Sequence, residues 1–181
     1  MKSILFYKTK LVLATIAVII IASSFTSAAP NDNQRILFTH ISPNEGLSQG
    51  IVVSSCQDSL GHMWFATHDG LNRYDGYRFT IYKNNPQDST SIADNLIKKV
   101  YIDSKGDLWI GTEKGLSFYD KDKDVFHNFG TDGKAVTGIA DIDETGMLII
   151  AAGGSIRIFD TDKHLWLNSA PPVRKKALER Q

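Results

Sequence analysis

Three fifteen-residue segments of this chain align with one another without gaps, and this repeat constrains the fold more than any other feature. The segments are GHMWFATHDGLNRYD at 61–75, GDLWIGTEKGLSFYD at 106–120 and GMLIIAAGGSIRIFD at 146–160, so their starts lie 45 and 40 residues apart. An aspartate stands three residues before each first glycine, at Asp58, Asp103 and Asp143. A repeat of this period predicts a stack of similar supersecondary units, because one unit cannot bury its own apolar faces.

The pattern predicts four short strands in each unit. An Asp-x-x-Gly tetrapeptide suits a type I turn between the first two strands, Ile51–Gln57 and His62–Thr67 in the first unit. The glycine of HDG or EKG suits a second turn, and a third strand follows it, Leu71–Tyr74 in the first unit. A polar turn then leads to a fourth strand, Arg78–Lys83. Stretches such as MWFAT and LWIGT are rich in aromatic and β-branched residues, and no 3.6-residue period is sustained between 30 and 168.

Four antiparallel strands per unit of about 40–45 residues are typical of a β-propeller blade. We therefore predict an all-β fold of about three blades in an incomplete ring. The predicted organisation is a signal peptide at 1–29, a closing strand within 36–41, repeat units at about 47–83, 94–129 and 135–168 inside a propeller region at 30–168, and a basic tail at 169–181.

The repeated positions are predicted to be structural. Trp64 and Trp109 recur at one position and are expected in the core between blades, with ligand stacking as the alternative. The third unit is a degenerate copy, with Ile149 at the tryptophan position and Ser155 where the others have glycine. The structural positions are Asp58, Gly61, Trp64, Thr67, Gly70, Tyr74, Asp103, Gly106, Trp109, Thr112, Gly115, Tyr119, Asp143 and Gly146.

Residues 1–29 have the layout of a secretory signal peptide. Three lysines and no acidic residue accompany the apolar run LVLATIAVIIIA, and small residues then precede Pro30. The alternative is an uncleaved anchor, although the run is short for a span of about 20 residues. Cleavage would leave 17 basic and 20 acidic residues. This mildly acidic balance with a single cysteine fits a periplasmic protein and gives no support to nucleic-acid binding.

The first two units closely resemble the two-component regulator propeller repeat. That repeat pairs a Gly-x-Leu/Met-Trp-Ile/Phe-Gly-Thr strand with a Gly-Leu-x-x-Tyr-Asp strand, and this chain has GHMWFATHDGLNRYD and GDLWIGTEKGLSFYD. The opening stretch FTHISPNEGLSQGIVVSSCQD is similar to the family's first segment after a signal peptide. The resemblance covers about 36–166 and is weaker in the third unit, where Ala151 and Ala152 replace Gly-Thr.

The resemblance implies a periplasmic sensor ectodomain at the N-terminal end of a hybrid two-component regulator. Such an ectodomain binds an oligosaccharide and controls polysaccharide-utilisation genes in polysaccharide-degrading bacteria. Another β domain, a membrane helix, a histidine kinase, a receiver and a helix-turn-helix domain follow it, so the expected partners are an oligosaccharide and downstream kinase domains. The family's motif residues are structural, and therefore no ligand-binding residue is carried over to this chain.

The chain departs from the family in length. The family's propellers commonly have seven blades, which need roughly 300 residues, whereas 152 residues follow the predicted signal peptide. We therefore expect a truncated N-terminal part of such a sensor, without kinase activity and without nucleic-acid binding of its own. Because three blades leave two open edges, we also expect self-association or aggregation.

The remaining chemistry of the sequence favours no catalytic, cofactor or metal site. The run from Asp120 to Asp124 alternates aspartate and lysine, but it lacks the glycine and glutamate of an EF-hand loop, so a solvated turn is expected. His62 and His68 lie six residues apart along one strand, roughly 20 Å, which is too far to share a metal ion. Cys56 has no evident cationic neighbour and is interpreted as a half-buried structural thiol.

Aromatic side chains are the features most suited to ligand binding. The stretch YDGYRFTIY contains Tyr74, Tyr77, Phe79 and Tyr82, and Tyr77 and Tyr82 are the candidates for sugar contacts. The polar stretch NNPQDSTSIADN at 84–95 is the longest connection and is predicted to form a rim loop. Two other functions stay open: a propeller lyase or hydrolase similar to streptogramin lyases, which needs a His/Glu metal site across blades, and a non-catalytic interaction scaffold.

Overall fold

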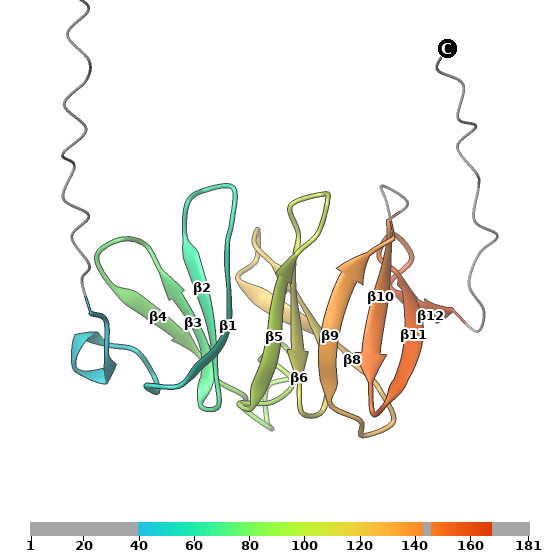
Figure 1. Cartoon of the computed structure of the whole chain (residues 1–181), viewed down its shortest axis with the longest axis horizontal. Coiled ribbons are helices and arrows are strands. Elements are labelled where there is room, and N and C mark those ends of the chain that lie inside the picture. Colours follow the sequence, from blue (N-terminus) through green and yellow to red (C-terminus); the bar gives the residue numbers. More distant parts are fainter. Residues whose placement is uncertain (1–39, 143–145, 168–181) are drawn as a thin grey trace, which may run out of the picture. The chain divides into compact units, whose positions relative to one another are not determined.

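A computed structural model describes residues 40–142 and 146–167 as three four-stranded antiparallel sheets (Figure 1). A 3-10 helix, Pro43–Glu45, precedes the first sheet. The strands are β1 (Val52–Gln57), β2 (Met63–Thr67), β3 (Gly70–Tyr74), β4 (Phe79–Tyr82), β5 (Ile97–Ile102), β6 (Leu108–Thr112), β7 (Gly115–Asp120), β8 (Val125–Gly130), β9 (Val136–Asp141), β10 (Met147–Ala152), β11 (Ser155–Asp160) and β12 (Leu165–Leu167).

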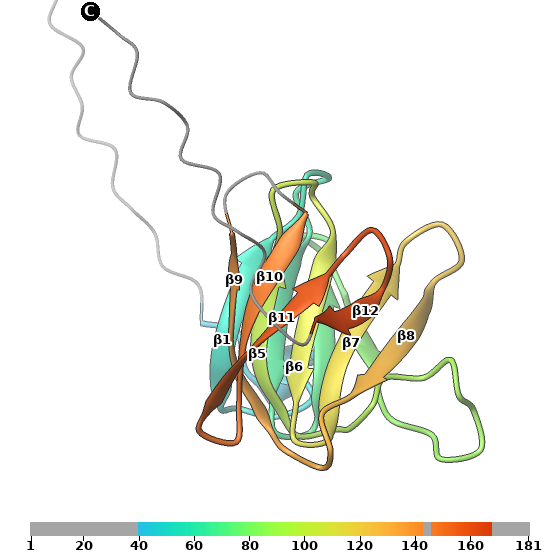
Figure 2. The ribbon, with the colours of Figure 1, turned by 90° about the vertical axis from the view of Figure 1, so that its right-hand side faces the viewer.

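Each sheet takes its strands in chain order, β1 to β4, β5 to β8 and β9 to β12, and we call these sheets blades 1, 2 and 3. Strands β1, β5 and β9 lie side by side, and in Figure 2 the blades stand one behind another. The predicted all-β fold of three four-stranded units is confirmed. Some predictions fall outside the described residues: the signal peptide, Asp143, the basic tail and 36–39 of the closing strand. The remaining two residues of that predicted strand, His40 and Ile41, lie in no strand.

The repeated Asp-x-x-Gly sequence forms a turn that also holds the repeated tryptophan. The amide of Gly61 donates to the Asp58 carbonyl at 3.0 Å, which closes the turn. Asp58 Oδ1 accepts from the amides of Leu60 and His62, while Oδ2 accepts from Trp64 Nε1 at 2.9 Å. In blade 2 the Asp103 carboxylate accepts two backbone amides in the same way and takes the Trp109 indole N–H at 2.8 Å. The motif is therefore one hydrogen-bonded unit.

The next turn explains the repeated glycine. Thr67 Oγ1 donates to the Gly70 carbonyl at 2.9 Å, and Thr112 repeats this bond to Gly115. Gly70 and Gly115 have φ of 112° and 152°, and a Cβ atom there would lie 2.8 and 2.7 Å from a carbonyl oxygen of the adjacent strand. In blade 3 the residues with positive φ in this turn are Gly153 and Gly154, at 55° and 77°. Serine is therefore tolerated at position 155.

A third repeated turn joins the last two strands of each blade. The carboxylate of Asp120 accepts the amides of Asp122 and Lys123 and binds Lys123 Nζ at 2.8 Å. Asp75 pairs with Arg78 and Asp160 pairs with Lys163 at the equivalent positions. The spacing of three residues between acid and base recurs in all three blades, and the sequence analysis missed it. The alternating charges after Asp120 thus cap a turn.

Asp120 should make the folded chain sensitive to acid in a defined range. The hydrogen bond from the Lys123 side chain lowers the pKa of Asp120 from its ordinary 3.8 to about 2. Because folding lowers this pKa, the stabilisation is complete above about pH 4 and is lost as the pH falls through about 2. We expect the Asp120→Asn variant to lose less stability than the wild type across this range, as measured by urea unfolding at each pH.

Asp122→Asn is the matched control for this experiment. The exposed Asp122 carboxylate forms no ion pair within the described part of the chain, so its variant should keep the pH dependence of the wild type. Equal acid sensitivity of the wild type and Asp120→Asn would contradict the prediction.

The hydrophobic core lies between blades and not within them. One cluster joins Trp64, Ala66 and Leu71 of blade 1 to residues of blade 2 such as Ile110 and Phe126. A second cluster joins blade 2 to blade 3, with Trp109, Leu116, Val136, Ile139, Leu148, Ile150, Ala152 and Phe159. Trp64 is 1% exposed and Trp109 is 0% exposed. Each blade therefore contributes one face to each of its neighbours.

Candidate functional site

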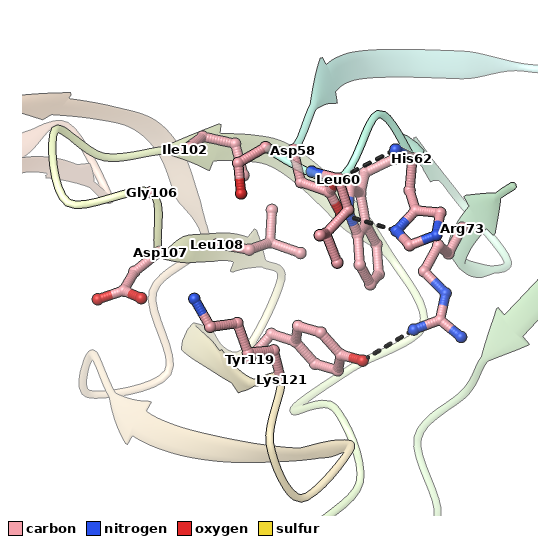
Figure 3. A pocket seen from close by; sticks show the side chains of 12 residues that line it. Asp58, Leu60, His62, Arg73, Ile102, Gly106, Asp107, Leu108, Tyr119 and Lys121 are labelled. Atoms are coloured by element: carbon pink, nitrogen blue, oxygen red, sulfur yellow. Dashed lines mark hydrogen bonds and ion pairs between the residues drawn. The ribbon is translucent and has the colours of Figure 1, made fainter.

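A cleft of about 180 Å³ opens between blades 1 and 2, beside the β1–β2 and β5–β6 turns (Figure 3). Its apolar wall includes Trp64, Ile102 and Leu108. Its polar groups are Asp58, His62, Arg73, Asp107, Tyr119 and Lys121. In Figure 3, Asp107 and Lys121 lie across the cleft from His62 and Arg73. The two blades therefore supply hydrogen-bond donors and acceptors around one apolar surface.

A polar network spans the two blades beside this cleft, and Arg73 and Tyr119 belong to both. Arg73 Nη1 donates to the Tyr119 hydroxyl at 3.0 Å, and its guanidinium lies 5.7 Å from the Trp64 ring centroid. The hydroxyls of Tyr119 and Tyr82 both donate to Asp124 Oδ1, at 2.6 and 2.8 Å. Arg73 and Tyr82 come from blade 1, whereas Tyr119 and Asp124 come from blade 2. The network therefore connects the two blades at the cleft.

The protonation states of this network are set by its surroundings. Burial raises the pKa of Tyr82, and the pKa of Tyr119 rises for the same reason. The hydrogen bond from Tyr119 lowers the pKa of Asp124. Both phenols therefore keep their protons at neutral pH and donate to an ionised carboxylate, which holds the direction of each hydrogen bond.

The remaining charged groups of the cleft differ in whether they already form hydrogen bonds or ion pairs with other side chains. Asp58 Oδ2 lies 3.2 Å from His62 Nδ1 and also accepts from Trp64. Burial opposes ionisation of Asp58, but these hydrogen bonds outweigh it and the pKa of its carboxyl is lowered. Burial raises the pKa of Asp107. Lys121 is exposed and forms no ion pair with any residue that the structure describes, so its ammonium group is available to a ligand.

The tyrosines considered from the sequence are separated by the strand alternation. Tyr74 and Phe79 pack together on the outer face of blade 1, with ring centroids 4.8 Å apart. Tyr82 lies on the opposite face, against Trp64, at 5.8 Å. Tyr77 is 95% exposed in the β3–β4 turn. The structure does not bring Tyr77 and Tyr82 together, and Trp64 has no open ring face for stacking.

The long connection at 84–95 packs onto blade 2. The Thr90 carbonyl accepts from the Phe126 amide at 2.8 Å, and the Ser91 carbonyl accepts from Asn128 Nδ2 at 2.8 Å. Ile92 is 0% exposed and belongs to the core cluster between blades 1 and 2. A second, polar hollow of about 270 Å³ lies beside this loop, at the end of the strands opposite to the cleft. The loop is thus part of the joint between blades.

Two further observations concern the chemistry of the site. Burial raises the pKa of Cys56 to about 11, so this thiol remains protonated at neutral pH and is a poor nucleophile. Within 40–142 and 146–167, no group of three or more His, Cys, Asp or Glu side chains is placed to hold a metal ion. Nor do these residues form a helix long and apolar enough to cross a membrane.

Comparison with known proteins identifies the repeats. The family model described as the two-component regulator propeller matches residues 46–69 and 91–114. Two segments of this chain match the two-component regulator propeller repeat. Each match runs from the segment before the first strand, through the Asp-x-x-Gly turn and tryptophan, to the second turn. The hydrogen-bonded Asp58–Trp64 unit and its copy in blade 2 therefore lie inside the matched sequence.

The relatives are much longer than this chain. Histidine kinase P4 of Formosa agariphila is 43% identical over 75 residues, which is 41% of this chain and 6% of that protein. The extracellular domain of the hybrid two-component system BT3049 of B. thetaiotaomicron is similar, with a TM-score of 0.61 and 28% identity over 72% of this chain and 20% of its own. That of BT4673 has a TM-score of 0.56 and 24% identity over 75% of this chain and 20% of its own. The predicted propeller fold is confirmed.

Arg73 and Lys121 of the cleft, and Asp124 of the network beside it, were not predicted from the sequence. Arg73 and its partner Tyr119 are 46 residues apart, and only the packing of two blades brings them together. Equivalent residues face the same way in every blade, so contacts across the joint pair different positions of the repeat, as Arg73 pairs with Tyr119. The repeat in the sequence therefore gave no direct signal for this pair.

Proposed function

We propose that this chain is the periplasmic ligand-sensing propeller region of a hybrid two-component sensor that detects oligosaccharides. The match of residues 46–69 and 91–114 to the regulator propeller repeat carries this proposal. It is supported by the similarity to the extracellular domain of BT3049, at 28% identity. The kinase and the DNA-binding function belong to other segments of such a sensor, and its output is the control of polysaccharide-utilisation genes. The chain itself binds and does not catalyse.

The cleft between blades 1 and 2 is the ligand site in this proposal. A sugar ring has hydroxyl groups that donate and accept hydrogen bonds, together with apolar C–H surfaces. Lys121 and Arg73 offer donors, Asp107 offers an acceptor, and Leu108 and Ile102 offer an apolar wall. The volume of about 180 Å³ is below the roughly 300–1,000 Å³ typical of drug-sized pockets. It therefore suits one ring of a longer saccharide that extends into solvent.

The position of the cleft gives a route for signalling. Its walls come from two blades, and the Arg73–Tyr119 hydrogen bond joins them at 3.0 Å. A saccharide that bridges Lys121 and Arg73 would favour one packing of these blades over another, because it stabilises the arrangement it binds best. The change would reach a kinase through the segments that follow the propeller.

Binding of saccharides by the 181-residue chain tests the proposal. We expect isothermal titration with cellohexaose, xylohexaose, laminarihexaose or a galacturonate trimer to detect binding of at least one of them. Lys121→Ala should weaken that binding roughly tenfold or more, since a hydrogen bond to a charged group contributes about 1.5–3 kcal/mol. Lys134→Ala is the control, because Lys134 is exposed in the turn before β9 and lies away from the cleft.

The outcomes separate the parts of the proposal. No binding of any of these saccharides would overturn oligosaccharide sensing by this chain. Binding that is equal in the wild type and Lys121→Ala would move the ligand site away from the cleft. Sequencing the coding DNA beyond codon 181 tests the sensor assignment independently, and further repeats followed by an apolar span and a kinase are the expected result.

A further inference from the structure

The cations of the cleft between blades 1 and 2 indicate which class of saccharide it binds. We propose that the cleft selects oligosaccharides of uronic acids, and that Arg73 and Lys121 recognise their carboxylates. This inference rests on the proposed function, because it takes the cleft as the saccharide site, and it adds the chemical class of the ligand. Arg73 comes from β3 and Lys121 from the β7–β8 turn, and both line the cleft.

Both cations keep N–H donors that no other side chain uses. One N–H of the Arg73 guanidinium donates to the Tyr119 hydroxyl at 3.0 Å, and its other N–H groups form no hydrogen bond with the residues that the structure describes. Asp124 Oδ1 lies 4.0 Å from Arg73 Nη1 and already accepts two phenol hydroxyls. Lys121 is exposed and has no ion pair within 40–142 and 146–167. An anionic group that enters the cleft therefore meets two cations with unused donors.

The two carboxylates that line the cleft do not neutralise these cations. Asp58 already accepts two backbone amides and the indole N–H of Trp64, so its charge is compensated locally. Asp107 lies on the opposite side of the cleft from Arg73 (Figure 3), and it forms no ion pair with any residue in the described ranges. Asp107 is therefore available to accept a sugar hydroxyl, while Arg73 remains open to an anion.

The joint between blades 2 and 3 shows that these free cations are not part of the repeat itself. Phe118 of blade 2 stands where blade 1 has Arg73. Thr161 of blade 3 stands where blade 2 has Lys121. The lysine that reaches across this second joint, Lys105, already forms an ion pair with an aspartate of the following turn. Unused positive charge is therefore specific to the joint that contains the cleft.

An oligomer of uronic acids matches this arrangement. Each of its rings carries one carboxylate, so one carboxylate can meet Arg73 while another reaches Lys121 across the cleft (Figure 3). An arginine can bind a carboxylate through two parallel N–H donors, and such charge-assisted hydrogen bonds are stronger than neutral ones. A neutral saccharide would displace water from both cations without giving them an anion, which costs free energy. Acidic saccharides should therefore bind more tightly than neutral saccharides of the same shape.

Isothermal titration of the 181-residue chain with matched acidic and neutral trisaccharides tests this inference. One pair is trigalacturonate and its methyl ester, and the other is a mannuronate trimer and mannotriose of the same linkage. We expect the acidic member of at least one pair to bind about tenfold or more tightly than its neutral counterpart. Its affinity should fall as NaCl rises from about 50 to about 500 mM, because salt screens charges that solvent reaches.

Variants of the two cations test whether the cleft is the source of this preference. Arg73→Gln and Lys121→Gln should each reduce the acidic preference about tenfold, whereas Arg73→Lys should retain part of it because the charge remains. Arg78→Gln is the matched control and should bind like the wild type, since the Arg78 side chain is 85% exposed and does not line the cleft. Near-ultraviolet circular dichroism checks that each variant is folded.

The outcomes distinguish this inference from the proposed function. Neutral members that bind as tightly as their acidic counterparts would overturn the selection of uronic acids and leave oligosaccharide sensing intact. An acidic preference that is unchanged in folded Arg73→Gln and Lys121→Gln would overturn the role of these two residues. A chain that binds no saccharide, acidic or neutral, would overturn both the proposed function and this inference.

Discussion

Replacing Trp109 with alanine is expected to lower the free energy of unfolding by about 3–5 kcal/mol. Trp109 is 0% exposed and packs against Phe118 and Phe159, with ring centroids at 5.0 and 5.4 Å. Its indole N–H also donates to Asp103 at 2.8 Å. The variant therefore leaves a cavity between blades 2 and 3 and removes one partner of a buried carboxylate. Urea unfolding followed by circular dichroism measures the change.

Ile149→Ala is the matched control, because Ile149 occupies the same position in the third repeat. Ile149 is 37% exposed, with no blade over it among residues 40–142 and 146–167, and its truncation should cost less than about 1 kcal/mol. Comparable losses for Trp109→Ala and Ile149→Ala would contradict the conclusion that the core lies between blades, since the effect would then follow from the position within a blade alone.

The second large effect is expected at Gly115. This residue has φ of 152°, and a Cβ atom would lie 2.7 Å from the Phe129 carbonyl oxygen on the neighbouring strand. Gly115→Ala therefore combines an unfavourable backbone angle with an overlap against backbone atoms that cannot move aside without breaking the β7–β8 pairing. We expect a loss of about 2–4 kcal/mol in urea unfolding, as backbone strain and overpacking each cost roughly 1–3 kcal/mol.

Gly106→Ala separates the two causes. Gly106 also has a positive φ, at 84°, but an added Cβ atom would meet nothing within 4 Å. This variant should therefore show the backbone cost alone, about 1–2 kcal/mol. If Gly115→Ala and Gly106→Ala lost the same stability, the close approach of β7 and β8 would not be the reason for glycine in this motif.

Local sequence was sufficient for the strands and turns. The Asp-x-x-Gly turns were predicted from residue preferences, and the structure closes the turn at Asp58 with a 3.0 Å hydrogen bond from Gly61. The repeated tryptophans were expected in the core, and Trp64 and Trp109 are 1% and 0% exposed. These features depend on neighbours within about ten residues, so short-range chemistry specifies them.

Most contacts of the candidate site could not be predicted from local sequence. The Tyr82 and Asp124 side chains are 42 residues apart and meet at 2.8 Å only because two blades stack. The loop at 84–95 was predicted as a rim loop from its polarity, and nothing in the sequence indicated that Ile92 anchors it between blades at 0% exposure. Tyr77 and Tyr82 are close in the sequence. In the structure Tyr77 is exposed in the β3–β4 turn, whereas Tyr82 packs against Trp64 on the face toward blade 2.

The sequence by itself determined that the chain forms four-stranded repeats, because period, turn residues and alternation act within each unit. Only the tertiary structure decided which residues face which blade, where the cleft opens, and which faces stay uncovered. The physical reason is that burial here occurs between units. Ile156 and Leu116 hold the same position in their repeats. Ile156 is 75% exposed and Leu116 is 0% exposed, because among the described residues only Leu116 has a neighbouring blade over it.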